Sequence, residues 1–551
     1  MNQKHRSAIL LGLLGIVLIA AGQEQGPARL TKAQALKDTR ALVQLLEASH
    51  PDPYINMGGK VEFKRRALEL ERSLPAEGLT VAELRSRLAE FLAGLRDGHT
   101  FLNPGRDDPW RDTSLWLPVD FSIVSDGLVI IDSDLPQLEG CRGGRLLAVN
   151  GHGVRELLDM MSRQFGAEND YSAYGKLSNT VRSFKFMKNF FPDLDRSGGI
   201  VYRLELPDGR SADRTIPWDA KSQAELQAWW MKKFAALRGG PGGDSMFSFR
   251  FIDHPAAACF RVAAIMGREA YEMALRENVG DAREMMADYY RSQKKDMPAD
   301  LEAALRGIPS FFEAGQELLR EMKTSGTRHL IIDLRGNSGG WTPMVFPFLH
   351  LLYGDAYYGH RSQARWVTVE SELYLKKNNA TVEEWRKRKG EPDFEVGKYR
   401  FEEETAGSAE EKRREAVDGY LQKGYSFAGA LKALGGSPLY TPPVIIVLCD
   451  PGTYSAAFHF MFYLKELGAR IVGVPSSQAP NTFMEVTPFT LPESGISGSI
   501  SNSAQIFIPD NPRADVLRPD FEVNYEILKQ YGFESDATLK YALDLIASGK
   551  L

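Results

Sequence analysis

The hydrophobic and polar positions divide the chain into three stretches with different periodicities. Residues 28–112 carry apolar positions at helical spacing, most clearly in the run 81–92, which predicts an N-terminal helical region. Residues 115–215 carry short apolar runs separated by turn residues, which predicts a β-rich domain. Residues 245–551 alternate apolar runs of strand length with helical patterns. This alternation favours an α/β core built on a mostly parallel sheet.

The core stretch contains nearly continuous apolar runs, which are typical of strands buried on both faces. The expected strands are 256–264, 329–334, 443–449 and 470–474, and the expected helices are 309–323, 343–353 and 455–467. A charged, Lys- and Glu-rich segment interrupts this alternation at about 360–436. We expect it to be a helical insertion, with a lid over the core as one interpretation.

The β-rich stretch has one distinctive segment. The sequence Leu-Leu-Ala-Val-Asn-Gly at 146–151 ends in a tight-turn signal, and a helical pattern follows at 154–161. This order resembles a PDZ-like domain. The alternative, another kind of small β-rich domain, stays open on the sequence alone.

The first residues have the three-part pattern of a secretory signal peptide. Lys4 and Arg6 precede the uncharged apolar run 8–21, and small residues at 20–22 offer a cleavage site. A membrane anchor is the alternative, but a spanning helix needs about 20 apolar residues. We therefore expect 1–22 to be a signal peptide, and the protein to be exported to the periplasm or outside the cell.

Charge and cysteine content exclude several classes. The net charge is −5 and the pI about 6.1, which argues against a sequence-independent nucleic-acid binder with a basic stripe. Three widely separated cysteines, Cys141, Cys259 and Cys449, allow at most one disulfide and show no zinc-binding spacing. No metal or organic cofactor is implied.

Two strand-to-helix junctions carry candidate chemistry. In Arg335–Trp341, glycines could expose backbone N–H groups to a ligand, as in an oxyanion hole, although such a turn can also serve packing alone. In Asp450–Ala457, Ser455 opens a helix, where the positive end of the helix dipole favours a developing alkoxide. Ser455 could equally be a simple N-cap.

A nucleophilic serine needs a base. Among nine histidines, His99 follows a helix that ends at a glycine, and His459 lies one helical turn after Ser455, where it could reach back. Gly336–Gly340 also matches the G-x-S-x-G nucleophile elbow, which makes Ser338 a rival nucleophile of the α/β-hydrolase type.

Taken in order, the motifs resemble the C-terminal-processing, or tail-specific, serine protease family. Leu95-Arg-Asp-Gly-His-Thr, the segment Leu330–Gly340 (Leu-Ile-Ile-Asp-Leu-Arg-Gly-Asn-Ser-Gly-Gly) and Thr453-Tyr-Ser-Ala-Ala, with Ile-Val-Gly-Val-Pro at 471–475, look like the family's three main elements. Segments at 489–495 and 518–523 resemble its closing strands. The resemblance implies a ClpP/crotonase-like catalytic core together with a PDZ-like domain.

The resemblance assigns Ser455 as nucleophile, with oxyanion donors at Gly339 or Gly340 and at Ala456. One branch of the family uses a lysine about 25 residues after the serine, but no lysine lies between Lys465 and Lys529. The tricorn-like branch uses the histidine of the first element, which is here His99. Its third member would be a glutamate that is missing here, which leaves three candidates open: Asp515, Asp510 and Glu485.

These assignments predict a serine endopeptidase acting on peptides or protein tails through an acyl-enzyme on Ser455. The alternative is a non-catalytic peptide- or ligand-binding protein on the same fold. An esterase using Ser338 is a third hypothesis. A peptide or protein is the expected partner; neither nucleic acid nor a stable membrane span is expected, and the oligomeric state is not indicated.

Overall fold

The computed structural model describes residues 29–105, 115–219, 246–278, 281–402 and 406–551, together with a few positions between 221 and 232. The expected signal peptide at 1–22 lies outside these residues. Within the described part of the chain, none of the helices is both long and apolar enough to cross a membrane.

The N-terminal region is helical, as predicted. Its main helices are α1 (Lys32–Ser49), α2 (Lys60–Arg72) and α3 (Val81–Ala93), with the short elements β1 (Arg29–Leu30), η3 (Ile55–Met57) and β2 (Leu79–Thr80). Helices α1 and α3 each begin at a threonine whose hydroxyl accepts a hydrogen bond from the N–H of the N3 residue. In return, the N3 side chain accepts a hydrogen bond from the backbone N–H of that threonine. Such reciprocal caps satisfy backbone groups that a helix end leaves free.

The β-rich domain contains an antiparallel sheet ordered β4-β5-β6-β8-β9, with β7 beside β6. Its core gathers the apolar faces of the strands and of α4 around Trp218 and Tyr202. The elements are β4 (Val119–Val124), β5 (Gly127–Ser133), η5 (Pro136–Leu138), β6 (Arg145–Val149), β7 (His152–Gly153), α4 (Val154–Gln164), α5 (Asp170–Thr180), α6 (Phe184–Phe190), η6 (Arg196–Gly198), β8 (Ile200–Glu205) and β9 (Ser211–Ile216).

The α/β core is built on a sheet ordered β10-β11-β12-β15-β16-β19, parallel except for the edge strand β10. Its strands are β10 (Phe247–Ile252), β11 (Ala257–Val262), β12 (His329–Asp333), β15 (Val444–Cys449), β16 (Arg470–Gly473) and β19 (Phe521–Glu522). The predicted mixture of an α/β core, a β-rich domain and a helical N-terminal region is therefore confirmed.

Helices cover both faces of this sheet. One face packs on α11, α12 and α18 through a large aromatic cluster that includes Phe260, Phe311 and Phe348. The other face packs on α20. The helices are α8 (Arg268–Glu277), α9 (Ala282–Ser292), α10 (Leu301–Arg306), α11 (Phe311–Ser325), η7 (Thr342–Val345), α12 (Phe346–Tyr353), α13 (Asp355–Gly359), α18 (Ala456–Glu466), α19 (Tyr525–Gln530) and α20 (Ala537–Ala547).

A second antiparallel sheet, ordered β14-β13-β18-β17, includes two strands from the segment 360–436, for which we expected helices in general terms only; the described part of the segment also contains four helices. Strand β13 (Arg365–Glu370) pairs with β18 (Ser497–Ile506), and β14 (Lys398–Phe401) extends the edge. Strands β13 and β14 both include charged residues, so their pattern is not easily distinguished from that of the charged helices around them. The remaining elements are α14 (Glu372–Lys377), α15 (Val382–Lys389), α16 (Ala409–Lys423), α17 (Ala428–Leu434) and β17 (Asn481–Thr490).

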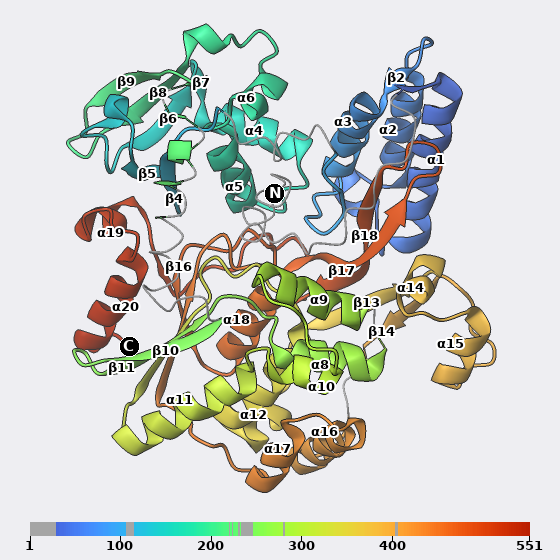
Figure 1. Ribbon diagram of the computed structural model, residues 1–551, viewed down its shortest axis with the longest axis vertical. Helices are drawn as coiled ribbons and strands as arrows, with labels where there is room; N and C mark the ends of the chain where they lie inside the picture. The colour runs from blue at the N-terminus through green and yellow to red at the C-terminus, as the bar shows by residue number, and fades with distance from the viewer. Residues whose placement is uncertain are drawn as a thin grey trace.

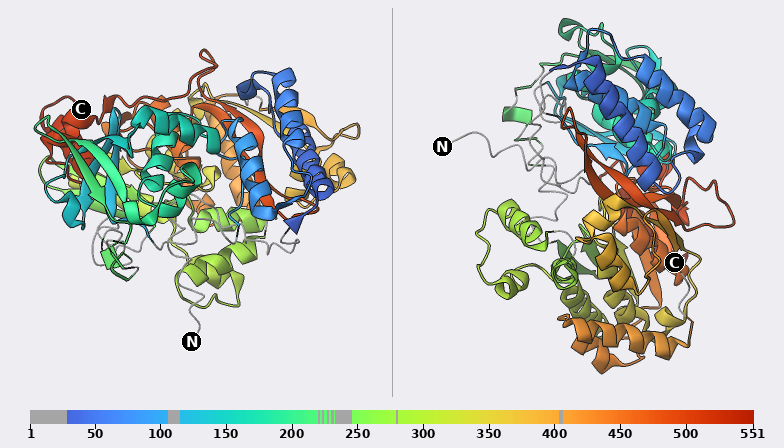
Figure 2. Two further views of the ribbon diagram at one scale, coloured as in Figure 1. Left: turned by 90° about the horizontal axis from the view of Figure 1, so that it is seen from above. Right: turned by 90° about the vertical axis from the view of Figure 1, so that its right-hand side faces the viewer.

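The N-terminal helices and the β-rich domain lie at the same end of the molecule, above the core (Figures 1 and 2). The long β17–β18 hairpin rises from the core and packs against the N-terminal helices through residues such as Phe489 and Ile500. Strand β5 of the β-rich domain packs against α19 in a cluster that includes Val129 and Leu528. The short strand β3 (Phe101–Leu102) joins β18 just after His99. The pairing of β3 with β18 thus attaches the loop that contains His99 to the hairpin of the core.

Candidate active site

Hydrogen bonds join the two strand-to-helix junctions that the sequence singled out. The Asp450 carboxylate accepts the Gly336 N–H at 2.7 Å, and the Tyr454 N–H donates to the Asn337 carbonyl at 2.9 Å. The Thr453 hydroxyl donates to the Leu334 carbonyl at 2.9 Å. Because β12 and β15 are neighbours and parallel, both loops leave the same sheet edge, where such sheets form their sites.

Ser455 occupies the N-cap of α18 in an unusual backbone conformation, with φ 54° and ψ −125°. A non-glycine residue with positive φ costs about 1–3 kcal/mol and persists only where its surroundings fix it. One such restraint is the Ser455 N–H, which donates to Oε1 of Gln478. This geometry directs attention to Ser455 as a functional residue and disfavours the simple N-cap, since its side chain caps no helical N–H.

The His99 ring faces Ser455 although the two are 356 residues apart in sequence. Its Nε2 lies 3.3 Å from the Ser455 Oγ. The residue is 9% exposed, and its ring stacks on the Tyr454 ring, with centroids 5.0 Å apart and an interplanar angle of 22°. The loop is held from behind because Asp97 Oδ1 accepts the His99 N–H at 2.8 Å and Thr100 Oγ1 accepts the Ser501 N–H at 3.0 Å.

The second ring nitrogen of His99 faces a tyrosine. Its Nδ1 lies 3.4 Å from Tyr454 Oη, and that hydroxyl donates to the carboxylate of Glu168. Glu168 is buried between α4 and α5, where it also accepts the Gly98 N–H at 3.2 Å and the Ala479 N–H at 2.8 Å. The β-rich domain therefore contributes a carboxylate to a site formed otherwise by the N-terminal region and the core.

Asp97 has a different partner. Its Oδ2 lies 3.2 Å from Nε2 of the buried His50, whose Nδ1 accepts the Asp52 N–H at 3.2 Å. Because Nδ1 is an acceptor, Nε2 carries the proton and donates to Asp97. Asp97 thus braces the loop rather than meeting the His99 ring nitrogens.

Burial sets the protonation of this cluster. Burial lowers the pKa of His99 below its usual value near 6.5, and the charges of Asp97 and Glu485 oppose this only in part. Burial raises the pKa of Glu168 to about 7, while the Tyr454 hydroxyl bond works against that rise. Burial alone would raise the pKa of Asp97, but its bond to His50 holds it below the usual value. At neutral pH the His99 ring is therefore mostly an uncharged base.

The expected oxyanion donors gather around Ser455, but they are not equivalent. The Gly339 N–H donates to Asn337 Oδ1 at 2.9 Å, so it is already paired. The N–H groups of Gly340 and Ala456 donate to no residue in the described part of the chain. A Cβ on Gly339 would lie 2.7 Å from Ala456 N, Ser455 Cβ and Tyr454 O, so its backbone lies directly against the nucleophile.

The other candidates lie apart from the Ser455–His99 pair. Asp510 and Asp515 have exposed side chains, and neither is bonded to His99 among the described residues. Glu485 has an ion pair with Lys377 at 3.2 Å and acts on His99 only through its charge. Ser338 forms no hydrogen bond with any histidine of the described chain.

His459 does not reach back to Ser455. Its Nδ1 lies 2.7 Å from Thr342 Oγ1, and its Nε2 lies 2.8 Å from Gln505 Oε1. Burial lowers its pKa to about 3. The same Gln505 oxygen accepts the Gln478 side-chain N–H at 3.2 Å. His459 therefore helps to fix Gln505, which in turn binds the Gln478 amide that accepts the Ser455 N–H.

Sequence reasoning missed Glu168, Tyr454 and Gln478. Tyr454 lies inside the recognised motif beside the serine and could have been singled out by position. Glu168 and Gln478 carry no local signal, because each becomes important only when distant segments meet.

Asp97, His99 and Glu168 each bring one ligand atom within 4.8 Å of the others, a set that could hold a metal ion. However, N–H and O–H donors of the protein already occupy the Asp97 and Glu168 oxygens. The donor set is therefore better suited to a hydrogen-bonded network than to a cation.

Part of the chain resembles a known protein family. Residues 307–511 match the model of peptidase family S41. The chain is therefore similar to this peptidase family over less than half of its length, in a segment that contains most of the α/β core. The matched segment includes Ser455 and both junction loops, whereas His99 and Glu168 lie outside it.

One curated relative is the Chlamydia pneumoniae protein CPj1016/CpB1054, 25% identical over 222 residues, or 40% of this chain. The match spans about a third (33%) of that relative's length. Among solved structures, mature CPAF in complex with lactacystin is similar over 94% of this chain and 98% of its own, with 16% identity and a TM-score of 0.54. Mature CPAF alone gives a TM-score of 0.52, also at 16% identity, over 94% and 96% of the two chains. At this identity the likeness shows a shared fold.

Proposed function

We propose that the protein is a serine endopeptidase in which Ser455 attacks a peptide carbonyl and His99 is the general base. The observation that carries the proposal is the 3.3 Å approach of His99 Nε2 to Ser455 Oγ at a strained helix N-cap. A nucleophile within hydrogen-bond reach of a base that a third group orients is the arrangement that such catalysis requires.

The hydrogen bonds around His99 support the following proton order. The Ser455 hydroxyl donates to Nε2, so the neutral ring carries its proton on Nδ1. Nδ1–H then donates to Tyr454 Oη, and the tyrosine hydroxyl donates to Glu168. Tyr454 and Glu168 thereby do what the third triad member does elsewhere: they hold the tautomer and stabilise the imidazolium that forms during attack.

The reaction then proceeds in two steps. Ser455 Oγ bonds to the substrate carbonyl carbon as His99 takes its proton, and the N–H groups of Gly340 and Ala456 stabilise the oxyanion. His99 returns the proton to the leaving amine, which leaves an ester on Ser455. Water, deprotonated by His99, attacks this ester; the bond between the carbonyl carbon and Ser455 Oγ breaks, His99 returns the proton to Oγ, and the carboxylic acid product leaves.

Substrate and location extend the same proposal. The family relationship suggests a peptide or protein tail as substrate, and a PDZ-like role for the β-rich domain would bring that tail to the site. Glu168 links this domain to His99, so that peptide binding and the orientation of the base are connected. The signal-peptide pattern at 1–22 favours an exported enzyme in the periplasm or outside the cell.

Labelling with a fluorophosphonate probe tests the proposal on protein lacking residues 1–22. We expect the probe on Ser455, with no label there in Ser455→Ala and strongly reduced label in His99→Ala. His152→Gln is the matched histidine control, because its ring faces Glu156 in the β-rich domain, and this variant should still be labelled. Label on Ser338 would overturn the assignment. An absence of label, together with tight peptide binding, would favour the non-catalytic binding protein.

A further inference from the structure

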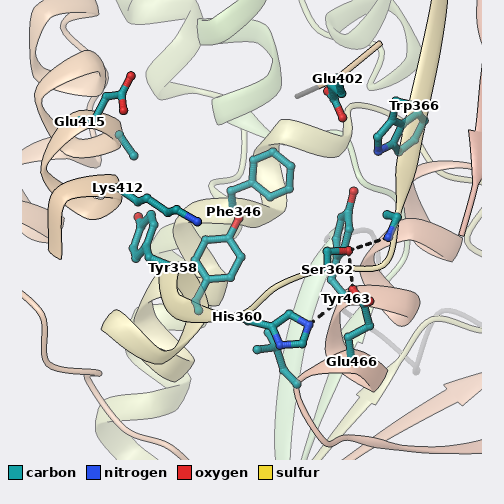
Figure 3. A pocket seen from close by; sticks show the side chains of 14 residues that line it. Phe346, Tyr358, His360, Ser362, Trp366, Glu402, Lys412, Glu415, Tyr463 and Glu466 are labelled. Carbon is teal, nitrogen blue, oxygen red and sulfur yellow. Dashed lines mark hydrogen bonds and ion pairs between the residues drawn. The ribbon is translucent and has the colours of Figure 1, made fainter. Parts of the chain in front are cut away.

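A pocket of about 520 Å³ lies beside the C-terminal half of α18, away from the Ser455–His99 pair (Figure 3). Helices α12, α13, α16 and α18 and strand β13 contribute to its wall. The volume lies within the range of small-ligand sites. Its lining is unusually aromatic, with rings from five residues: Phe346, Tyr357, Tyr358, Trp366 and Tyr463.

The polar part of the lining is mostly acidic. Glu402, Glu415 and Glu466 contribute carboxylates, whereas Lys412 and His360 contribute the basic groups, with His360 Nε2 3.7 Å from Glu466 Oε2. The Glu466 oxygens accept the Ser362 hydroxyl at 2.7 Å and the Gln363 N–H at 2.8 Å. Glu402 and Glu415 form no ion pair within the described part of the chain. Burial and the charge of Glu485 raise the pKa of Glu402, as expected for a carboxylate that lacks a cation.

Aromatic faces and carboxylates together favour one class of ligand. The negative face of an aromatic ring attracts a cation, and the attraction grows when the cation loses water. The pocket already accommodates one alkylammonium, since the Lys412 side chain extends into it from α16 (Figure 3). Within the described chain, that ammonium is bonded to no carboxylate. The pocket is therefore suited to an organic cation.

The pocket lies beside the C-terminal end of α18, and Ser455 lies at the N-terminal end of the same helix. Tyr463 lies eight residues after Ser455, which corresponds to roughly 12 Å along the helix at 1.5 Å per residue. The Trp366 ring lies 5.1 Å from the ring of His459, one turn after the serine. An extended peptide advances about 3.3 Å per residue. A side chain in the pocket would thus belong to a substrate residue roughly three or four positions from the cut bond.

We propose that this pocket is a substrate subsite for a cationic side chain, lysine or arginine, roughly three or four residues from the cleaved bond. This inference rests on the proposed peptidase function. It adds a substrate class that the catalytic residues do not define.

Binding to Ser455→Ala protein tests the subsite without cleavage. The probes are neutral peptides with a single lysine moved along the chain, each paired with a norleucine peptide that keeps the alkyl stem and removes the charge. At one position we expect lysine to bind about tenfold more tightly than norleucine. Glu402→Gln and Glu402→Lys should reduce this preference stepwise, and Lys412→Gln should increase it because the resident cation is gone.

The matched control is Glu410→Gln, which removes the same charge from α16 outside the pocket. It should leave the lysine preference unchanged, and thermal unfolding checks that every variant is folded. Equal binding of lysine and norleucine peptides at all positions would overturn the subsite. Wild-type cleavage of the norleucine peptides is the separate readout for peptidase function, so the two proposals fail independently.

Discussion

Replacing Gly339 by alanine tests whether its close approach to Ser455 controls the reactivity of the serine. Gly339 has φ +100°, and an added Cβ would lie 2.7 Å from three atoms of Tyr454, Ser455 and Ala456. Non-bonded carbon contacts are comfortable at about 3.5–4.0 Å, so the serine or the glycine loop must move by roughly 1 Å. Misplacement on that scale reduces catalysis by about 100-fold.

Gly336→Ala separates this steric effect from backbone strain. Gly336 also has positive φ, at +67°, but a Cβ there would meet nothing within 4 Å. A left-handed conformation costs an L-residue about 1–2 kcal/mol, so both variants should lose stability. Only Gly339→Ala should also displace the nucleophile.

The assay compares the rate of fluorophosphonate labelling with the free energy of unfolding in denaturant. We expect labelling of Gly339→Ala to slow by about 100-fold or more, and that of Gly336→Ala to stay within a few-fold of wild type. The reasoning is refuted if a folded Gly339→Ala protein is labelled at the wild-type rate, or if both variants slow equally.

Three further predictions concern the residues behind the serine. Tyr454→Phe removes the hydroxyl between His99 and Glu168. We expect kcat/KM to fall about 10- to 100-fold, which corresponds to the free energy of one hydrogen bond to a charged group. An unchanged pH profile of labelling would contradict this role. The labelling rate should fall only below pH 6.5, because buried His99 has a lowered pKa and must be neutral to act, and a midpoint above 6.5 would contradict this assignment. The pKa of Glu168 is about 7 in the folded state, so the folded state binds this proton more tightly than the unfolded chain does. The proton therefore contributes to the free energy of unfolding in full below pH 4.5, and this contribution, roughly 3 kcal/mol, is lost as the pH rises through about 7. Glu168→Gln should remove this slope from unfolding curves measured between pH 5 and 7.5, and an unchanged slope would refute it.

Sequence reasoning located the parts of the site that lie in continuous segments. The runs at 329–334 and 443–449 are so apolar that only buried strands fit them, and the polar loops after them had to meet at one sheet edge. The pairing of Ser455 with His99 came from the order of family motifs, because nothing in the local pattern around His99 distinguishes a base from a structural histidine.

The parts that escaped prediction depend on contacts between distant segments. Glu168 gains its role from the docking of the β-rich domain, which brings it to Tyr454 across 286 residues. The strand at 365–370 was hidden because its partner, β18, lies more than 130 residues later. A single sequence contains no record of such pairings, whereas turn and capping residues act within a few positions.

The three contributors to the site are also separated in time during synthesis. His99 leaves the ribosome first and Glu168 follows, while Ser455 is added 356 residues after the histidine. At about 5–20 residues per second, that interval lasts roughly 20–70 seconds. A growing chain therefore has the base but no nucleophile until Ser455 is added after β15, when strands β16 to β19 are still to be made. The separation of the site along the chain delays any reactivity until the protein is nearly complete.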